Sequence, residues 1–299
     1  MINMKRCFSN KKTNDFIYNI AITRDISRNI NDGIRSTSKT FNSFVNLDKA
    51  IEQKGRLNEV LKSLGINIKN LVSDDCPDSC FIEDTIVIRN NSICITNPGA
   101  QSRKKEIFSV SNYIKNHFNN NFKITDMNEN NDNATLDGGD VLYVGNNEFY
   151  VGVNNNRTNE KGLLKLKIAF PDFKIHSIDI KPHMKNILHL KSALSIVGHN
   201  KIVLGGDTGK QIVLSNKSFS TDKFEFISIP DIEASNLIYA NDAIITRSSK
   251  EYPLSIEKIK DSIGKGNVIE INMDELEKLD GALTCCSVLF NIWLLFVIT

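Results

Sequence analysis

A cycle of strand-like apolar segments and one helix recurs along most of the chain, and this recurrence limits the possible folds more than any single motif. Apolar segments at residues 66–72, 85–88 and 92–96 precede a helix predicted for residues 103–117. Comparable groups follow, so the cycle is completed about five times. The units repeat a structural pattern without repeating a motif, which favours one closed, pseudo-symmetric α/β domain.

The chain has 299 residues, of which 40% are hydrophobic and 24% charged, enough to bury a sizeable core. No linker rich in Pro, Gly or Ser divides it. We therefore predict a flexible lead-in at residues 1–14, a single domain at 15–291 and an apolar tail at 292–299. The tail is too short to span a bilayer. A tail that packs on the body, or a misread terminal exon, is favoured over a membrane anchor.

Charge and cysteine content exclude several classes of function. The formal net charge is +2, and the only dense basic run is the short 103–105, so an extended nucleic-acid surface is not expected. Six cysteines are too few for a disulfide scaffold in a chain of this length, and no signal peptide precedes them. A reduced, cytoplasmic setting follows. Cys76 and Cys80 lack the second pair that a zinc site needs, so no metal is expected.

A pair of cysteines near the C-terminus is the best candidate for a nucleophile. In the segment 279–290, a glycine and small residues lead into Cys285 and Cys286, and an apolar run follows. This pattern places a thiol where a tight turn enters a buried strand. Such a thiol needs a proton-transfer partner, and His189 is a candidate. His189 lies in the apolar run 187–190, predicted as a strand, so a buried core histidine is the alternative.

Acidic residues cluster in two places. Asp78, Glu83 and Asp84 fall at the entrance to an apolar strand, where like charges this close need a cation to offset their repulsion. Solvated loop acids are the alternative. The segment 137–140 (DGGD) joins two strands, and its glycines allow close backbone approach. A plain turn would have the same composition.

Two arginines stand where the helix dipole does not favour them. Arg103 and Arg157 each lie at the start of a predicted helix. This position suggests another task, such as gripping a carboxylate through two hydrogen bonds. Ordinary surface arginines are the alternative.

Six segments, taken together and in order, resemble the dimethylarginine dimethylaminohydrolase family. They are 78–84 (DSCFIED), 98–106 (PGAQSRKKE), 133–142 (NATLDGGDVL), 157–159 (RTN), 188–192 (LHLKS) and 275–289 (ELEKLDGALTCCSVL). The resemblance implies the pentein fold, a five-bladed ββαβ α/β propeller with its active site in the central channel. It also implies hydrolysis of asymmetric dimethylarginine or monomethylarginine to citrulline and dimethylamine or methylamine, without a metal or organic cofactor.

The resemblance implies roles for individual residues. Cys285 corresponds to a nucleophile that forms a thiouronium intermediate, His189 to the acid and then the base, and Asp137 to the carboxylate that holds His189. Cys286, its neighbour, is expected to point to the opposite face by strand alternation. The implied substrate contacts are Glu83 and Asp84 to the guanidinium, Asp78 and the carbonyl of Ile34 to the ammonium, Arg103 and Arg157 to the carboxylate, and the backbone of Leu279 to the pocket wall. The loop around Ile34 corresponds to a lid.

Two other functions stay open from the sequence. An arginine deiminase would use the same thiol, histidine and acids but release ammonia from unmethylated arginine. A catalytically silent pentein would only bind arginine-like ligands or a protein. We expect a small-molecule methylated arginine as the partner, no nucleic acid, no stable membrane association, and a monomer or homodimer.

Overall fold

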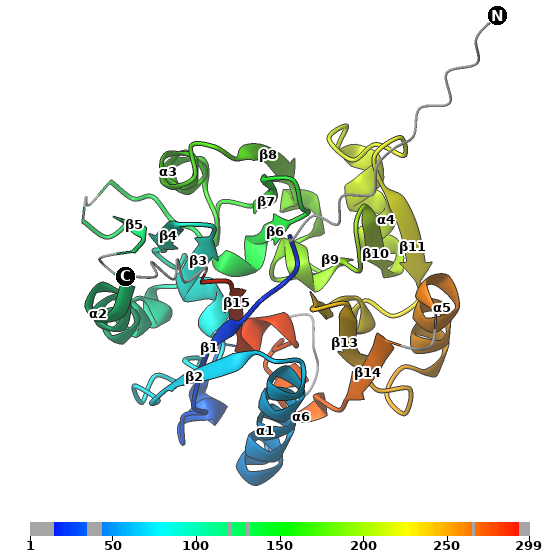
Figure 1. The fold of residues 1–299 in the computed structure, drawn as a ribbon, viewed down its shortest axis with the longest axis horizontal. Helices are drawn as coiled ribbons and strands as arrows, with labels where there is room; N and C mark the ends of the chain where they lie inside the picture. Colours follow the sequence, from blue (N-terminus) through cyan, green and yellow to red (C-terminus); the bar gives the residue numbers. More distant parts are fainter. Residues whose placement is uncertain (1–14, 35–43, 119–120, 130–131, 265–266, 293–299) are drawn as a thin grey trace, which may run out of the picture.

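In the part of the chain that the structure describes, the strands form five three-stranded sheets around a common centre (Figure 1). The computed structural model describes residues 15–34, 44–118, 121–129, 132–264 and 267–292. The predicted lead-in, and all of the predicted tail except its first residue, lie outside these ranges. The strands are β1 (Ile20–Arg24), β2 (Asn67–Leu71), β3 (Ile86–Arg89), β4 (Ser92–Ile95), β5 (Lys123–Asp126), β6 (Val141–Tyr143), β7 (Glu148–Val153), β8 (Lys174–Asp179), β9 (Leu194–Ile196), β10 (Lys201–Gly205), β11 (Glu225–Ile229), β12 (Ile238–Ala240), β13 (Ala243–Arg247), β14 (Val268–Ile271) and β15 (Val288–Phe290).

Every sheet repeats one topology, in which the central strand has one antiparallel and one parallel neighbour. In the third sheet, β7 pairs antiparallel with β6 and parallel with β8, and a helix connects β7 to β8. Parallel neighbours need such a crossover connection. The α-helices are α1 (Leu47–Ser63), α2 (Ile107–Phe118), α3 (Glu160–Ala169), α4 (Gly206–Ser215), α5 (Pro253–Ile263) and α6 (Asp274–Glu277). The five repeats confirm the predicted ββαβ propeller.

The first sheet is closed by the last strand of the chain. β15 pairs antiparallel with β1, with Ile20 opposite Phe290 and Ile22 opposite Val288. Phe290 is 1% exposed and packs edge-on against Phe118, with ring centroids 5.7 Å apart. This closure returns the C-terminal segment to the centre of the molecule, where Figure 1 shows β15 beside β1 and β3.

Amphipathic spacing explains the peripheral helices. In α1, Asn46 caps the first turn by accepting a hydrogen bond from the amide of Lys49, and Leu57 and Leu61 are buried on the inner face. Gly65 follows the helix at φ +81°, a conformation that costs glycine little. The helix predicted to begin at Asn46 and to stop at Gly65 is confirmed.

Two sequence expectations are corrected by the fold. The strand predicted at residues 187–190 is wrong: His189 precedes a 3-10 helix, and its amide donates to the Ser192 hydroxyl at 3.3 Å. Ile187 and Leu190 are apolar because they pack in the core, not because they pair in a sheet. Strands β8 and β11 were not predicted, since each lies at a sheet edge and alternates polar with apolar residues.

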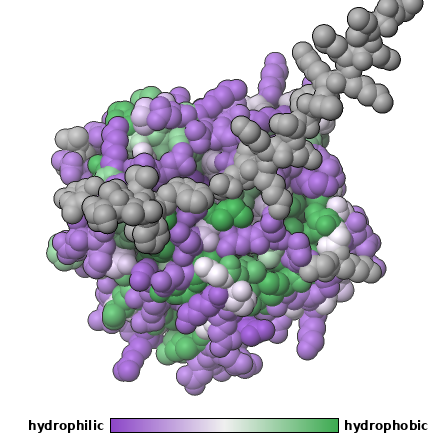
Figure 2. Space-filling model, viewed as in Figure 1, coloured by the Kyte–Doolittle hydropathy of each residue, from purple (hydrophilic) through white to green (hydrophobic). Residues whose placement is uncertain are grey.

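The outer surface mixes polar and apolar residues. On the face drawn in Figure 2, hydrophobic residues form patches between hydrophilic ones. Among the helices in the described ranges, none combines the length and the apolar character that crossing a membrane requires.

Candidate active site

Short 3-10 turns precede the five inner strands and converge on the centre. They are η2 (Ile82–Thr85) before β3, η4 (Gly138–Asp140) before β6, η6 (Leu190–Ser192) before β9, η7 (Glu233–Ser235) before β12 and η9 (Thr284–Cys286) before β15. η2 contacts both η4 and η9, and η4 contacts η6. Side chains that are far apart in the chain therefore meet beside these turns.

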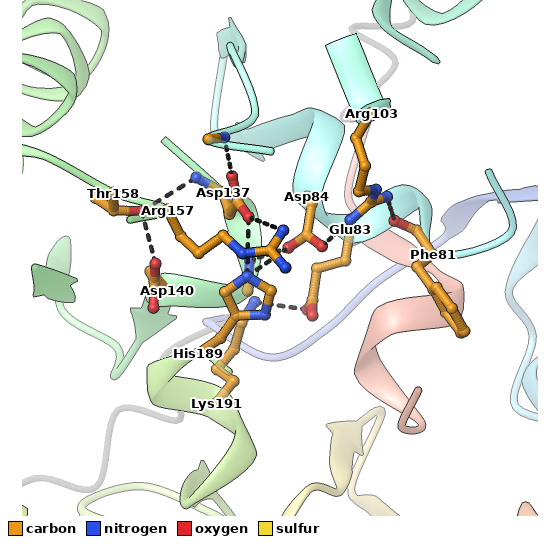
Figure 3. A network of polar contacts seen from close by, with 12 residues as sticks. Phe81, Glu83, Asp84, Arg103, Asp137, Asp140, Arg157, Thr158, His189 and Lys191 are labelled. Atoms are coloured by element: carbon orange, nitrogen blue, oxygen red, sulfur yellow. Dashed lines mark hydrogen bonds and ion pairs between the residues drawn. The ribbon is translucent and has the colours of Figure 1, made fainter. Parts of the chain in front are cut away.

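His189 is held and charged by two aspartates. Its Nε2 lies 2.9 Å from Oδ2 of Asp137 and 3.9 Å from Oδ1 of Asp84 (Figure 3). The other oxygen of Asp137 accepts a hydrogen bond from the Gly99 amide at 2.8 Å, which fixes the carboxylate. Burial opposes protonation, but the Asp84 charge and the Asp137 hydrogen bond outweigh it and raise the pKa of His189 to about 9. The imidazole is therefore a proton donor at neutral pH.

Asp84 is a buried carboxylate that stays ionised. Its Oδ1 accepts from the Gly139 amide at 2.8 Å, and its Oδ2 pairs with Nη1 of Arg103. Burial alone would favour the neutral acid. The charges of His189 and Arg103 and the Gly139 hydrogen bond outweigh burial, and they hold the pKa of Asp84 well below its usual range. A full negative charge thus faces the cavity.

The two glycines of the DGGD segment make this packing feasible. A side chain at Gly138 would collide with the carbonyl oxygen of Glu83. A Cβ at Gly139 would lie 2.8 Å from Nδ1 of His189 and 2.8 Å from Asp84. The close backbone approach expected from the sequence is therefore confirmed.

Cys285 and Cys286 have different surroundings. Cys285 lines a small cavity together with His189 and Asp84, whereas Cys286 is 0% exposed and belongs to the hydrophobic core. The two side chains diverge because they lie in the 3-10 turn η9, not because strand residues alternate. Burial, followed by the charges of Glu83 and Asp84, raises the pKa of Cys285 well above its ordinary value. Cys285 is therefore a protonated thiol in the free enzyme at neutral pH.

Most of the predicted site residues share this cavity, which we call the acidic cavity. Eight of them line it: Ile34, Asp78, Asp84, Arg103, Arg157, His189, Leu279 and Cys285. The other two, Glu83 and Asp137, lie behind this wall. The structure thus brings the predicted set together from all parts of the chain.

The guanidinium groups of both arginines already pair with carboxylates of the protein. Arg103 is 4% exposed and forms a two-pronged pair with Glu106, with Nε and Nη2 at 3.0 and 2.8 Å from the carboxylate oxygens. Nη1 of Arg157 lies 3.5 Å from Asp137. Both guanidinium groups reach the acidic cavity while they also support its carboxylates.

Asp78 and Ile34 form the outer part of the cavity. The Ile34 amide donates to both oxygens of Asp78, at 3.1 and 3.2 Å. Burial raises the pKa of Asp78, although the charge of Arg103 works against this shift. Of the predicted lid loop, residues 35–43 lie outside the described residues.

Glu83 is held on the far side of η2 from Asp84. Lys191 donates to Oε1 of Glu83 at 2.5 Å (Figure 3). The Thr284 hydroxyl donates to Oε2 of Glu83 at 2.8 Å. Burial raises the pKa of Glu83, although the Lys191 charge opposes the shift. The carboxylate therefore adds negative potential behind the thiol without facing the acidic cavity.

A second cavity, which we call the aromatic cavity, lies behind the same turns. Glu83, Lys191 and Thr284 line it, whereas their chain neighbours Asp84, His189 and Cys285 line the acidic cavity. Most of its wall is apolar or aromatic, with Phe16, Tyr18, Tyr143, Phe149 and Tyr239 among the lining residues. The same turns thus separate two cavities of different chemistry.

Sequence analysis missed several residues that complete the site. They are Glu106, Asp140, Thr158, Lys191, Asn236 and Thr284. Asp140 accepts from the Leu190 amide at 3.0 Å, beside His189, and burial raises its pKa to about 7. Its place in the DGGD segment could have revealed it. Asn236 stands in no motif and gave no signal.

One group of potential metal ligands occurs in the described part of the chain. Asp84, Asp137 and His189 offer ligand atoms that lie within 4.8 Å of one another. However, each carboxylate oxygen of both aspartates already accepts a hydrogen bond or ion pair from a protein group. The donor set fits proton transfer and cation binding better than metal coordination.

Five ββαβ blades around a centre that contains a thiol, an imidazole and buried carboxylates define the pentein class of enzymes. The model of a family described as N,N dimethylarginine dimethylhydrolase, eukaryotic, matches residues 27–290. The chain therefore belongs to the dimethylarginine dimethylaminohydrolase family and is an enzyme of that family.

Individual relatives agree with this assignment. An N(G),N(G)-dimethylarginine dimethylaminohydrolase of Pseudomonas aeruginosa is 28% identical over 272 residues, covering 90% of this chain and 98% of the relative. One of Streptomyces coelicolor is 30% identical over 216 residues, covering 72% and 76%. A solved structure of the Pseudomonas aeruginosa enzyme, a Cys-to-Ser mutant complexed with citrulline, superposes with a TM-score of 0.77 at 27% identity, covering 92% of this chain and 100% of that one.

Proposed function

We propose that this enzyme hydrolyses Nω,Nω-dimethyl-L-arginine, and monomethyl-L-arginine, to L-citrulline and dimethylamine or methylamine through a covalent intermediate on Cys285. The observation that carries the proposal is that Cys285, His189 and Asp84 line one cavity, with Asp137 hydrogen-bonded to the imidazole. Membership of the family and the citrulline complex of a relative support the same reaction.

The charge balance of the site suits a cationic substrate. Six buried acidic side chains stand near three basic side chains and the imidazole of His189. The acids are Asp78, Glu83, Asp84, Glu106, Asp137 and Asp140, and the basic side chains are Arg103, Arg157 and Lys191. A guanidinium that enters the acidic cavity offsets part of this excess. In this proposal Asp84 binds the guanidinium directly, and Glu83 adds charge from behind.

The thiol becomes reactive when the substrate binds. The pKa of Cys285 is high in the free enzyme because the thiolate is buried near acids. A cation placed beside the sulfur stabilises the thiolate, and the displaced proton leaves to solvent. The thiolate then attacks the guanidinium carbon to form a C–S bond.

His189 transfers the protons of both half-reactions. Protonated at neutral pH, it donates to the methylated nitrogen as the C–N bond breaks, so that the neutral amine leaves and a thiouronium remains on Cys285. Neutral His189 then takes a proton from water as the oxygen attacks the same carbon. Breakage of the C–S bond gives the ureido group of citrulline and returns the thiolate, with one proton released.

In this proposal the remaining candidate site residues hold the amino-acid end of the substrate. Asp78 and the Ile34 carbonyl bind its ammonium, Arg103 and Arg157 bind its carboxylate, and the Leu279 backbone borders the channel. Their common position on the acidic cavity supports these roles. The pair with Glu106 helps to orient the Arg103 guanidinium for this role.

Product analysis on purified protein tests the proposal. We expect citrulline and dimethylamine from dimethylarginine, with a higher kcat/KM than for ammonia release from arginine. An acid quench followed by intact-mass measurement should show an adduct that is absent in Cys285→Ser. Faster ammonia release from arginine would instead indicate a deiminase, and ligand binding without citrulline would indicate a silent pentein.

A further inference from the structure

The fifth inner turn, η7, supplies a side chain that links the turns of the thiol and the imidazole. Asn236 directly follows η7 and is 2% exposed. Each of the other four turns contains, or directly follows, a residue of the proposed chemistry, whereas Asn236 comes directly after its turn. The contacts of the Asn236 side-chain amide therefore help to decide how the turns of the site are held together.

Asn236 bonds to both neighbouring turns. Its Oδ1 accepts from the Thr284 amide at 2.9 Å, directly before Cys285. Its Nδ2 donates to the carbonyl of Lys191 at 2.9 Å, two residues after His189, and to the Thr284 hydroxyl at 3.0 Å. An amide N–H can only donate and a carbonyl can only accept, so these two backbone partners fix which way the side-chain amide faces.

The contacts continue into a closed circuit. The Thr284 hydroxyl donates to Glu83, and Lys191 donates to the other oxygen of Glu83. We call Glu83, Lys191, Asn236 and Thr284 the bridging network. It joins four of the five blades directly behind the sulfur and the imidazole. Because its four members come from separate turns, they act as one unit only while every bond is made.

We propose that Asn236 is a positioning residue that sets the placement of the Cys285 sulfur relative to the His189 imidazole. It does so through Thr284 on one side and Lys191 on the other, without contacting the substrate. A misplacement of about 1 Å in such a pair costs on the order of 10²-fold in rate. This inference rests on the proposed function, because it assumes that sulfur and imidazole act on the same carbon.

Two variants test the inference, with dimethylarginine as substrate. Asn236→Ala removes all three bonds, and we expect kcat to fall on the order of 10²-fold while KM changes by less than about three-fold. Asn236→Asp keeps an acceptor for the Thr284 amide and loses the donor to Lys191 when it is ionised. Its kcat relative to wild type should rise as the pH is lowered, because a protonated carboxyl regains one donor. If Asn236 contributed only to stability, kcat of the folded Asn236→Asp enzyme would not follow pH in this way.

Asn241 provides the matched control, because it makes three similar bonds and does not line the acidic cavity. Its Oδ1 accepts from the Tyr18 amide at 2.7 Å, and its Nδ2 donates to the carbonyls of Tyr18 and Leu64 at 2.9 and 2.8 Å. Glycine is the proper replacement, since Asn241 has φ +52°. We expect Asn241→Gly to lower the thermal midpoint but to leave kcat within about two-fold of wild type.

The outcomes separate the inference from the proposed function. If wild type makes no citrulline, the proposed function fails, and the inference is then judged by the rate of Cys285 alkylation with iodoacetamide. That rate should change on the order of ten-fold in Asn236→Ala and stay unchanged in Asn241→Gly. Should Asn236→Ala fail to fold, Asn236→Asp decides alone. Wild-type kcat in folded Asn236 variants, a flat pH trend in Asn236→Asp, or equal kcat losses in the Asn241 control would overturn the inference.

Discussion

The acidic cavity and the aromatic cavity are built on the same turns, yet only one of them has reactive groups. Asp84, His189 and Cys285 line the first, whereas the second is lined by rings that contact one another. Phe16 and Tyr143 pack with centroids 5.6 Å apart, and the Tyr143 hydroxyl donates to Asp15 at 2.6 Å.

The difference shows which features make a buried charge useful. In the aromatic cavity Arg89 lies 3.9 Å from the Tyr143 ring centre and 2.6 Å from the Tyr18 hydroxyl, so neighbouring rings and hydroxyls already satisfy its cation. In the acidic cavity, the charge of Asp84 outweighs burial and raises the pKa of His189. Burial, together with the nearby acids, raises the pKa of Cys285. A site that awaits a cation can change the state of its thiol when the cation arrives.

The largest expected effect separates the two cysteines. Cys285→Ser should abolish citrulline formation, a loss of at least about 10³-fold, because a serine hydroxyl in this acidic site stays protonated. Cys286→Ser should retain most of the activity and lose about 1–3 kcal/mol of stability, since it buries a hydroxyl in the core. Citrulline assays and urea unfolding measure both. The reverse result would reassign the nucleophile.

A large effect is also expected from neutralising Asp84. Asp84→Asn should reduce kcat/KM on the order of 10²-fold or more. It should also lower the pKa of His189 from about 9, because the Asp84 charge is the main cause of the upward shift. NMR titration of the imidazole measures this pKa.

Asp126→Asn is the control. Asp126 lies on β5, pairs with Lys115 at 2.8 Å and lines neither cavity. The control should leave the titration of His189 unchanged. An unshifted pKa in Asp84→Asn would show that Asp84 does not control the imidazole.

The ionisation of the Cys285 thiol should depend on a bound cation. Alkylation of Cys285 should need alkaline pH in the free enzyme, because burial and the two acids raise its pKa. A non-reactive cationic arginine analogue should move the apparent pKa downward, whereas a neutral analogue such as citrulline should not. Rates measured against pH, with cysteine-resolved mass spectrometry, give both curves. Coinciding curves with and without the cation would disprove substrate-assisted ionisation.

A smaller effect is expected in stability against pH. His189 has a folded-state pKa of about 9, above the unfolded value of about 6.5. Its stabilising contribution is therefore complete below about pH 6.5 and is lost as the pH rises through about 9. Urea unfolding should show the free energy of unfolding falling across this window by a few kcal/mol. His189→Gln should flatten the curve, and an equal slope in this variant would place the titration elsewhere.

The smallest effect is expected in the aromatic cavity. Tyr143→Phe removes only the hydroxyl that donates to Asp15. We expect a loss of about 1 kcal/mol in stability and a change in kcat/KM of less than about two-fold. Parallel unfolding and citrulline assays test this. A ten-fold loss of activity would mean that the two cavities are coupled more strongly than their separate linings suggest.

Local patterns were enough to predict a large part of this molecule. The apolar spacing of residues 47–63 and the proline at Pro253 mark α1 and α5, because helix periodicity and capping depend on neighbours a few residues apart. The Gly-rich DGGD segment and the cysteine pair likewise indicated turns that position candidate catalytic residues. Most of the candidate residues that line the acidic cavity were therefore available from short motifs.

Tertiary structure alone decided how these residues face one another. Pairing of β1 with β15 joins the first and last strands of the described residues and closes the ring, in which η2 contacts η4 and η9, and η4 contacts η6. The hydrogen bond between His189 and Asp137, and the link from Asn236 to Thr284 and Lys191, join different blades. A sequence pattern reports on near neighbours, whereas hydrogen bonds across blades depend on distances that exist only once the blades have packed around their centre.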